Sequence, residues 1–299
     1  MAVLDEAQEN GLHLRQIEAD RDLKERPMNR KGLDYLTLAG AAPDAFVRLA
    51  AEAGCAHVAL TPALPEILGG RDPLWSLIAD APLRRATRNA LTDTGISLAL
   101  MDGYVLSPSS TADDHRRVLD LAGDLGTRRV NTVSFVDWAR TLDETAWMVA
   151  LAAEYGMTVV VEPCAMLTAA SLAQALDLIA YVGLPNFKLL IDTMHVARTG
   201  EAGDLAALDP GMIDYVQISD APLAMPSLDA YMEEALHERM IPGSGELPLV
   251  EMLRAVPETV VISAEVPLRS LREAGVSDLE RVRRIVASVD CVLAEARAG

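Results

Sequence analysis

Short apolar runs alternate with longer amphipathic segments from residue 34 to the end of the chain. The short runs are rich in β-branched residues, as buried strands are, and the longer segments repeat apolar residues with the helical period. Several long segments end in Gly just before the next run, and Gly is the residue most often found at the carboxyl end of a helix. The pattern predicts strands over residues 35–39, 57–61, 97–101, 129–133, 158–162, 188–192, 215–219 and 260–265.

The segments between these strands predict the helices of repeated βα units. Their expected ranges are 43–54, 72–94, 111–125, 142–155, 168–182, 247–255 and 277–298, with a short turn near 204–208. Eight βα units in this length fit an α/β fold of the (β/α)8 type, a single-domain TIM barrel. A doubly wound dinucleotide-binding sheet fits less well, because the first turn, LAGAAPDAF, lacks the glycine pattern G-x-G-x-x-G.

Two segments stand apart from the repeat. Residues 1–33 are charged and predict an N-terminal arm or tail before a catalytic barrel domain at 34–299, with Met28 as an alternative start of the natural chain. The loop 221–246 is the longest connection and carries its own helical stretch, LDAYMEEALHER. Long loops in compact domains are usually lids or binding loops, so this loop is expected to border the site.

Composition narrows the class of protein and its location. The chain has 299 residues, of which 51% are hydrophobic, enough for a large core. Its three cysteines, Cys55, Cys164 and Cys291, are odd in number and widely spaced, which argues against disulfides and indicates a reducing cytoplasm. We therefore expect a cytoplasmic protein without a membrane segment. A net charge of −18 disfavours nucleic acids and anionic membranes as partners.

The predicted ends of the last four strands carry the candidate chemistry. TIM-barrel enzymes place their sites at the carboxyl ends of the strands, and here these ends carry Glu162, Asp192, Gln217 and Glu265. Three carboxylates crowded inside a barrel repel one another unless a cation lies between them. The four side chains are therefore predicted to hold one divalent metal ion. Oxygen ligands favour manganese or magnesium, with zinc, cobalt and iron as alternatives.

A metal beside carboxylates indicates a reaction type. It polarises a carbonyl and stabilises an enediolate while a carboxylate removes the α-proton, which is the chemistry of sugar epimerisation and isomerisation. Glu162 and Glu265 are the predicted acid–base pair, acting on opposite faces of the substrate. His195 and Arg239 are predicted to bind substrate oxygens, and the glycines of residues 242–245 to bring N–H groups to the mouth. A capping histidine and a solvated arginine are the alternatives.

Five segments resemble a known family: EP at 162–163, PNFKLLIDTMH at 185–195, VQISDAP at 216–222, R-x-x-PGSGELPL at 239–249 and AEVP at 264–267. On these, the chain resembles the sugar phosphate isomerase/epimerase family of xylose-isomerase-like TIM barrels. The resemblance implies the same four metal ligands, and His195 and Arg239 as substrate-binding residues. Gln217 departs from the pattern, because ketose epimerases usually have a histidine there. This difference implies that the site binds its metal more weakly, prefers a harder metal ion, or serves a different reaction.

Other functions share part of this pattern. A metal-dependent lyase or dehydratase acting on a keto-sugar, inosose or keto-glycoside begins with the same α-proton abstraction and is the main alternative. A non-catalytic polyol-binding barrel is a further one. The apurinic-endonuclease branch of the family is disfavoured by the charge of −18 and by only five histidines. The expected partner is a small carbohydrate or polyol, and homo-oligomers are common in the family.

Overall fold

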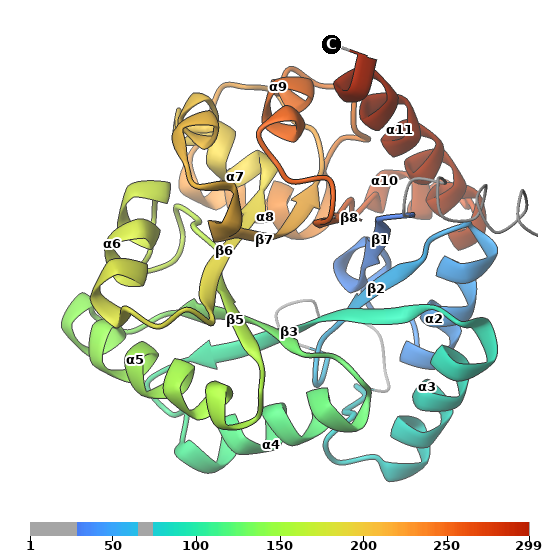
Figure 1. Cartoon of the computed structure of the whole chain (residues 1–299). Helices are drawn as coiled ribbons and strands as arrows, with labels where there is room; N and C mark the ends of the chain where they lie inside the picture. Colours follow the sequence, from blue (N-terminus) through green and yellow to red (C-terminus); the bar gives the residue numbers. More distant parts are fainter. Residues whose placement is uncertain (1–28, 65–73, 299) are drawn as a thin grey trace, which may run out of the picture.

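Eight parallel strands form a closed barrel in which β8 pairs back onto β1 (Figure 1). The computed structural model describes residues 29–64 and 74–298. The strands are β1 Lys31–Asp34, β2 His57–Leu60, β3 Ser97–Leu106, β4 Arg129–Ser134, β5 Thr158–Val161, β6 Phe187–Asp192, β7 Ile213–Ile218 and β8 Val261–Ala264. The predicted single-domain TIM barrel is confirmed.

Helices surround the barrel, as Figure 1 shows. They are α2 Pro43–Glu52, α3 Ala81–Thr94, α4 Ala112–Asp124, α5 Trp138–Glu154, α6 Leu172–Val182, α7 Thr193–Arg198, α8 Leu228–His237, α9 Leu249–Arg254, α10 Arg269–Glu273 and α11 Asp278–Ala298. Short 3-10 turns lie at Tyr35–Leu38, Ala202–Ala207 and Pro210–Met212. The two short helices α7 and α10 were not predicted. Within the described ranges, none of the helices has the length and apolarity needed to cross a membrane.

The first strand lies earlier than the pattern predicts. The run at 35–39 was expected to be a strand, but Tyr35–Leu38 forms a buried 3-10 turn, and the strand is Lys31–Asp34. This strand pairs with both β2 and β8. The barrel therefore begins before residue 34, and the last residues assigned to the arm belong to it. The rest of the predicted arm, residues 1–28, lies outside the described residues.

The alternation of side chains along the strands places the polar site. An apolar cluster inside the barrel includes Leu100, Val160, Leu190 and Tyr215. Because alternate side chains of a strand face the same side, the residue two positions further on also faces the barrel interior, nearer the carboxyl end. These residues are Asp102, Glu162, Asp192 and Gln217. The barrel interior thus changes from apolar to acidic at its carboxyl end.

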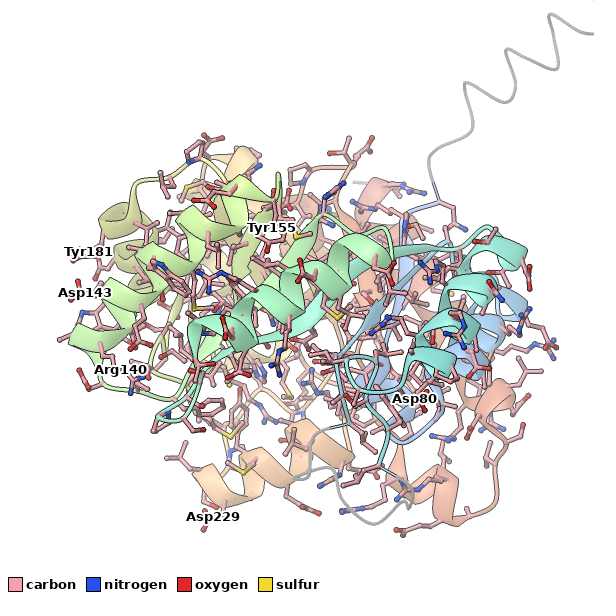
Figure 2. All side chains as sticks on the ribbon, turned by 90° about the horizontal axis from the view of Figure 1, so that it is seen from below. Asp80, Arg140, Asp143, Tyr155, Tyr181 and Asp229 are labelled. Atoms are coloured by element: carbon pink, nitrogen blue, oxygen red, sulfur yellow. The ribbon has the colours of Figure 1, made fainter. Side chains whose placement is uncertain are left out.

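Helix α8 comes from the long loop after β7, and its helical stretch was predicted. Figure 2 shows this helix, marked by Asp229, at one end of the barrel, beyond the first turn of α5 marked by Arg140. Helices in a βα barrel begin at the carboxyl end of the strands. The α8 segment therefore lies at the same end as the acidic residues.

Candidate active site

A pocket of about 330 Å³ opens at the carboxyl end of the barrel. This volume is at the small end of the range for small-molecule sites. The acidic and basic residues that line it are Asp102, Glu162, His195, Arg239 and Glu265, and Tyr35 and Thr61 add hydroxyl groups. The predicted residues Asp192 and Gln217 are completely or almost completely buried and lie in contact with this floor. The structure therefore brings all six predicted site residues together.

The two predicted catalytic glutamates reach the pocket from well-separated strands. Glu162 follows β5 and exposes 12% of its side chain, and Glu265 follows β8 and exposes 6%. Burial raises the pKa of Glu162 to about 8, and the charges of Asp192 and Asp102 add to the shift. Burial also raises the pKa of Glu265 well above its usual value, against the opposing effect of Arg239. In the metal-free floor, Glu162 can therefore hold a proton near neutral pH.

Arg239 is a fixed cation beneath the pocket. Its Nη1 lies 2.6 Å from Asp192 Oδ2, and its Nη2 lies 2.8 Å from Glu265 Oε2. Its Nε donates to the carbonyl of Ala235, and the side chain is only 2% exposed. Burial opposes the positive charge, but the two carboxylates outweigh it and raise the pKa of Arg239 above its usual value. The alternative of a solvated arginine is therefore wrong.

Asp192 joins this ion pair to the start of α7. Its Oδ1 accepts hydrogen bonds from the N–H groups of Met194 and His195, at 2.8 and 3.1 Å. Burial disfavours its charge, but Arg239 and His195 outweigh that effect and hold the pKa of Asp192 below its usual range. Asp192 is therefore the carboxylate of the floor that is most firmly ionised.

His195 lies between a tyrosine and the acidic floor. Its Nδ1 is 2.5 Å from the hydroxyl of Tyr231 on α8, and its Nε2 is 3.4 Å from Glu162 Oε1. Burial lowers the pKa of His195 to about 4, so the ring is neutral at physiological pH. A neutral imidazole in this place can donate to a substrate oxygen or bind a metal through Nε2.

Gln217 contacts two carboxylates through its amide nitrogen. Nε2 donates to Asp34 Oδ2 at 3.0 Å and to Glu265 Oε1 at 3.1 Å. Its carbonyl oxygen is buried and has no hydrogen-bond partner among the described residues. A buried carbonyl without a partner is costly, and a bound cation would satisfy it.

Three site residues were missed from the sequence: Asp34, Asp102 and Asn131. The Asn131 amide donates to Asp102 Oδ1 and Glu162 Oε2, both at 3.0 Å. Burial raises the pKa of Asp34 to about 7, with the charge of Asp102 adding to the effect. Asp34 ends the strand that was misplaced, and Asp102 lies within β3, which was expected to end at residue 101 but continues to Leu106. The alternation from Leu100 could have identified Asp102.

The charge of the floor fits a divalent cation. Ligand atoms of Glu162, Asp192 and His195 lie within 4.8 Å of one another, and those of Asp34, Asp102 and Glu265 form a second such group. Arg239 lies between Asp192 of the first group and Glu265 of the second. Among the described residues, this one guanidinium leaves most of the carboxyl groups without a counter-charge, and the Gln217 carbonyl has no hydrogen-bond partner. The residues present thus fit a metal, although the predicted ligands fall into two groups.

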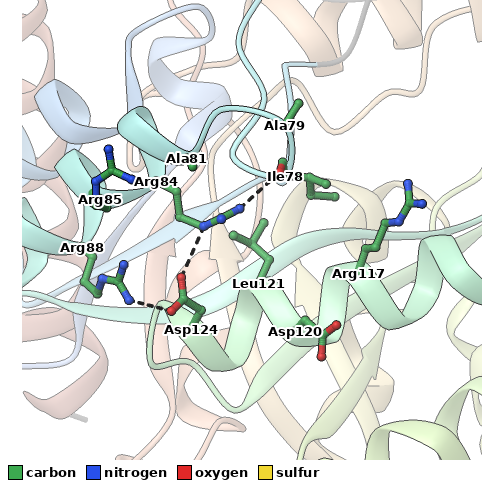
Figure 3. Close-up of a pocket in the computed structure, with 10 residues that line it drawn as sticks. All are labelled: Ile78, Ala79, Ala81, Arg84, Arg85, Arg88, Arg117, Asp120, Leu121 and Asp124. Carbon is green, nitrogen blue, oxygen red and sulfur yellow. Dashed lines mark hydrogen bonds and ion pairs between the residues drawn. The ribbon is translucent and has the colours of Figure 1, made fainter.

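A larger groove of about 720 Å³ lies on the outer surface between α3 and α4 (Figure 3). Its Arg84 and Arg88 pair with Asp124 at 3.4 and 2.6 Å, and all three side chains are at least 30% exposed. Exposed pairs of this kind contribute little to stability and bring no buried acid or base to the groove. The barrel mouth, with its buried carboxyl groups, is therefore the candidate active site.

Comparisons with known proteins agree with this fold. The chain is 28% identical over 196 residues to a 2-epi-5-epi-valiolone 7-phosphate 2-epimerase from Actinoplanes sp., which covers 60% of this chain and 68% of that protein. A solved xylose isomerase-like TIM barrel/4-hydroxyphenylpyruvate dioxygenase fusion protein matches with a TM-score of 0.72 and 19% identity, over 90% of this chain but only 43% of the fusion protein. The IOLI protein with a bound zinc atom matches with a TM-score of 0.70 and 16% identity, over 89% of this chain and 99% of that protein.

The family match covers most of the chain. Residues 47–289 match the family described as xylose isomerase-like TIM barrel, and a relative that is 28% identical is named as an epimerase. Together with the closed eight-stranded barrel, this match confirms the resemblance inferred from the motifs. The chain belongs to the xylose isomerase-like TIM barrel family.

Proposed function

We propose that the protein is a divalent-metal-dependent epimerase or isomerase of a sugar or keto-sugar, which acts by α-proton abstraction through an enediolate. The observation that carries the proposal is the pair of glutamates, Glu162 after β5 and Glu265 after β8, which face one pocket from well-separated strands. Epimerisation requires a base on one face of the substrate and an acid on the other. The epimerase relative supports this reaction class.

The residues have distinct roles in this proposal. One glutamate removes the α-proton, and the other returns a proton to the opposite face of the substrate. Neutral His195 donates from Nε2 to a substrate oxygen. Arg239 is held too firmly by Asp192 and Glu265 to move, so it fixes the position and charge of Glu265 and binds substrate only at the pocket surface.

Two sets of residues could hold the metal. The family pattern uses Glu162, Asp192, Gln217 and Glu265, whereas the grouping in the structure joins Glu162 and Asp192 to His195. Manganese or magnesium suits the oxygen donors, and a nitrogen from His195 would also suit zinc, cobalt or iron. When bound, the metal would polarise the substrate carbonyl and stabilise the enediolate.

A lyase or dehydratase is the second candidate, and Asp102 favours it. This carboxyl group lines the same pocket from β3, and burial raises its pKa above the usual value. A third acid in the pocket could protonate a leaving group after the α-proton is removed. Loss of that group would then give β-elimination instead of epimerisation.

The test is exchange of the substrate α-proton with solvent deuterium, followed by NMR over a panel of ketoses, inososes and keto-glycosides with added Mn²⁺ or Mg²⁺. Glu162→Gln and Glu265→Gln are expected to slow exchange by about 100-fold or more, because each removes an acid–base group. The exposed Glu251→Gln on α9 is the matched control and should retain the wild-type rate. Unchanged exchange in Glu265→Gln would refute its role, and an elimination product would select the lyase.

A further inference from the structure

The walls of the pocket differ from its acidic floor. Five of the apolar side chains that line the pocket come from the segments after β4 and β5 and from α8, and we call them the collar: Phe135 after β4, Met166 and Leu167 after β5, and Met232 and Leu236 on α8. Phe135 is 57% exposed and Met232 is 40% exposed. Large apolar side chains exposed together at a pocket rim indicate a site for an apolar group.

The basic side chains of the pocket are poorly placed to bind a phosphate group. His195 is 4% exposed, and its ring nitrogens lie 2.5 Å from the Tyr231 hydroxyl and 3.4 Å from Glu162 Oε1. Arg239 is committed to Asp192 and Glu265. Among the described residues that line the pocket, these two are the basic ones, whereas Asp102, Glu162 and Glu265 are acidic and Tyr35 and Thr61 carry hydroxyl groups. A phosphate dianion would therefore find neither basic side chain of the described pocket free to pair with it, and any carboxylate that the proposed metal does not neutralise would repel it.

The usual phosphate position of a TIM barrel is already filled by this chain's own carboxylates. That position is made by the loops after the seventh and eighth strands and the start of a short extra helix. After β7, the N–H groups of Gly243 and Gly245 donate to Asp220 Oδ2 at 2.8 and 2.9 Å, and the N–H of Leu247 donates to Asp220 Oδ1 at 3.1 Å. The expectation that the glycine turn directs its N–H groups into the mouth is therefore wrong.

The loop after β8 follows the same arrangement. The short helix α10 begins at Arg269, and the N–H of Ser270 donates to Glu238 Oε2 at 2.7 Å. The hydroxyl of Ser270 also bonds to Glu238. In both loops, the backbone N–H groups that could hold a phosphate thus donate to a carboxylate of this chain.

We propose that the pocket takes a non-phosphorylated sugar ring that carries an apolar substituent, with the ring hydroxyls on the acidic floor and the substituent against the collar. This inference rests on the proposed function for the position of the ring and adds the class of substrate. It separates the protein from the epimerase relative, which is named for a 7-phosphate. Burial of Phe135 and Met232 beneath the substituent would supply the added affinity.

The test is calorimetric titration of the full chain with phenyl glycosides of glucose, galactose, mannose and xylose, alongside the matching free sugars and sugar phosphates. At least one phenyl glycoside is expected to bind about tenfold more tightly than its free sugar, equivalent to about 1.4 kcal/mol, and its sugar phosphate to bind more weakly than both. Phe135→Ser should remove the phenyl advantage. Tyr181→Ser on α6 is the matched control, because Tyr181 is 53% exposed and outside the pocket.

Three results would overturn the inference: tighter binding of a sugar phosphate than of its phenyl glycoside, an unchanged phenyl advantage in Phe135→Ser, or no binding of any phenyl glycoside. The titration does not depend on turnover. Binding of a phenyl glycoside, together with no deuterium exchange in any member of the ketose, inosose and keto-glycoside panel, would therefore refute the proposed function and leave the substrate class standing.

Discussion

Two amide side chains, Asn131 and Gln217, hold the acidic floor together. Each donates from its amide nitrogen to two carboxyl groups on different strands: Asn131 joins Asp102 to Glu162, and Gln217 joins Asp34 to Glu265. An amide satisfies carboxylate oxygens but brings no charge. The floor therefore keeps its excess of carboxyl groups, which must either bind protons or a cation.

This excess predicts how the stability of the metal-free protein depends on pH. The pKa of Glu162 is about 8 in the folded protein against 4.5 for the free group, so the unfolded chain releases this proton first. The stabilising effect is fully present below pH 4.5 and is lost as the pH rises through 8. Asp34, with a pKa of about 7, acts in the same direction. In EDTA, we expect Tm to fall by about 4 °C or more between pH 5 and 8.

Circular dichroism melts of the wild type and two variants test this predicted fall in Tm with rising pH. Glu162→Gln should reduce the fall in Tm, because a neutral amide cannot release a proton, whereas the exposed Glu251→Gln should keep the wild-type dependence. Added Mn²⁺ should raise the Tm of wild type most at pH 8, where it replaces the lost protons. A metal-free Tm that rises from pH 5 to pH 8 would contradict the proposed protonation of the floor.

At the scale of elements, the hydrophobic pattern predicts most strands because each is apolar and buried on both faces. It fails at β1, whose sequence KGLD has Lys and Gly where an apolar run was expected, while the apolar run that follows packs as a 3-10 turn. Asp34 was lost with that strand. The motif identified Arg239 as a site residue. Its pairing with Asp192 and Glu265 depends on how the end of β6 and the loops after β7 and β8 meet in space, which a local sequence pattern cannot predict.

The glycine turn after β7 depends on close packing at Gly245. A Cβ at Gly245 would overlap Asp220 Oδ1 and lie 2.6 Å from the carbonyl oxygen of Ala221. Gly245→Ala must therefore displace the turn from Asp220, and we expect it to lower the free energy of unfolding by about 2 kcal/mol. Gly203→Ala is the control, because a Cβ there meets no atom within 4 Å. Equal stability of the two variants in urea unfolding would show that close packing does not fix the turn.

For the whole molecule, closure of the barrel depends on β1. This strand pairs with β2 through Gly32 and His57 and with β8 through Leu33 and Ala264. Without it, the barrel has two unpaired edges, which expose backbone donors and acceptors to other chains. Deletion of β1 would also remove the Asp34 carboxyl group from the acidic floor.

Two shortened chains test this dependence. A chain that starts at Asn29 contains all eight strands and should give a near-ultraviolet circular dichroism spectrum and a cooperative melt like those of the full chain. A chain that starts at Tyr35 lacks β1 and should lose both signals and aggregate, because β2 and β8 have no partner to close the ring. A native spectrum from the shorter chain would mean that the barrel closes at the boundary first expected from the sequence, and that Lys31–Asp34 is dispensable. Lys31–Asp34 pairs with β2 on one side and β8 on the other, which contradicts a barrel that begins only at residue 34. We therefore expect the chain that starts at Asn29 to fold and the chain that starts at Tyr35 not to fold.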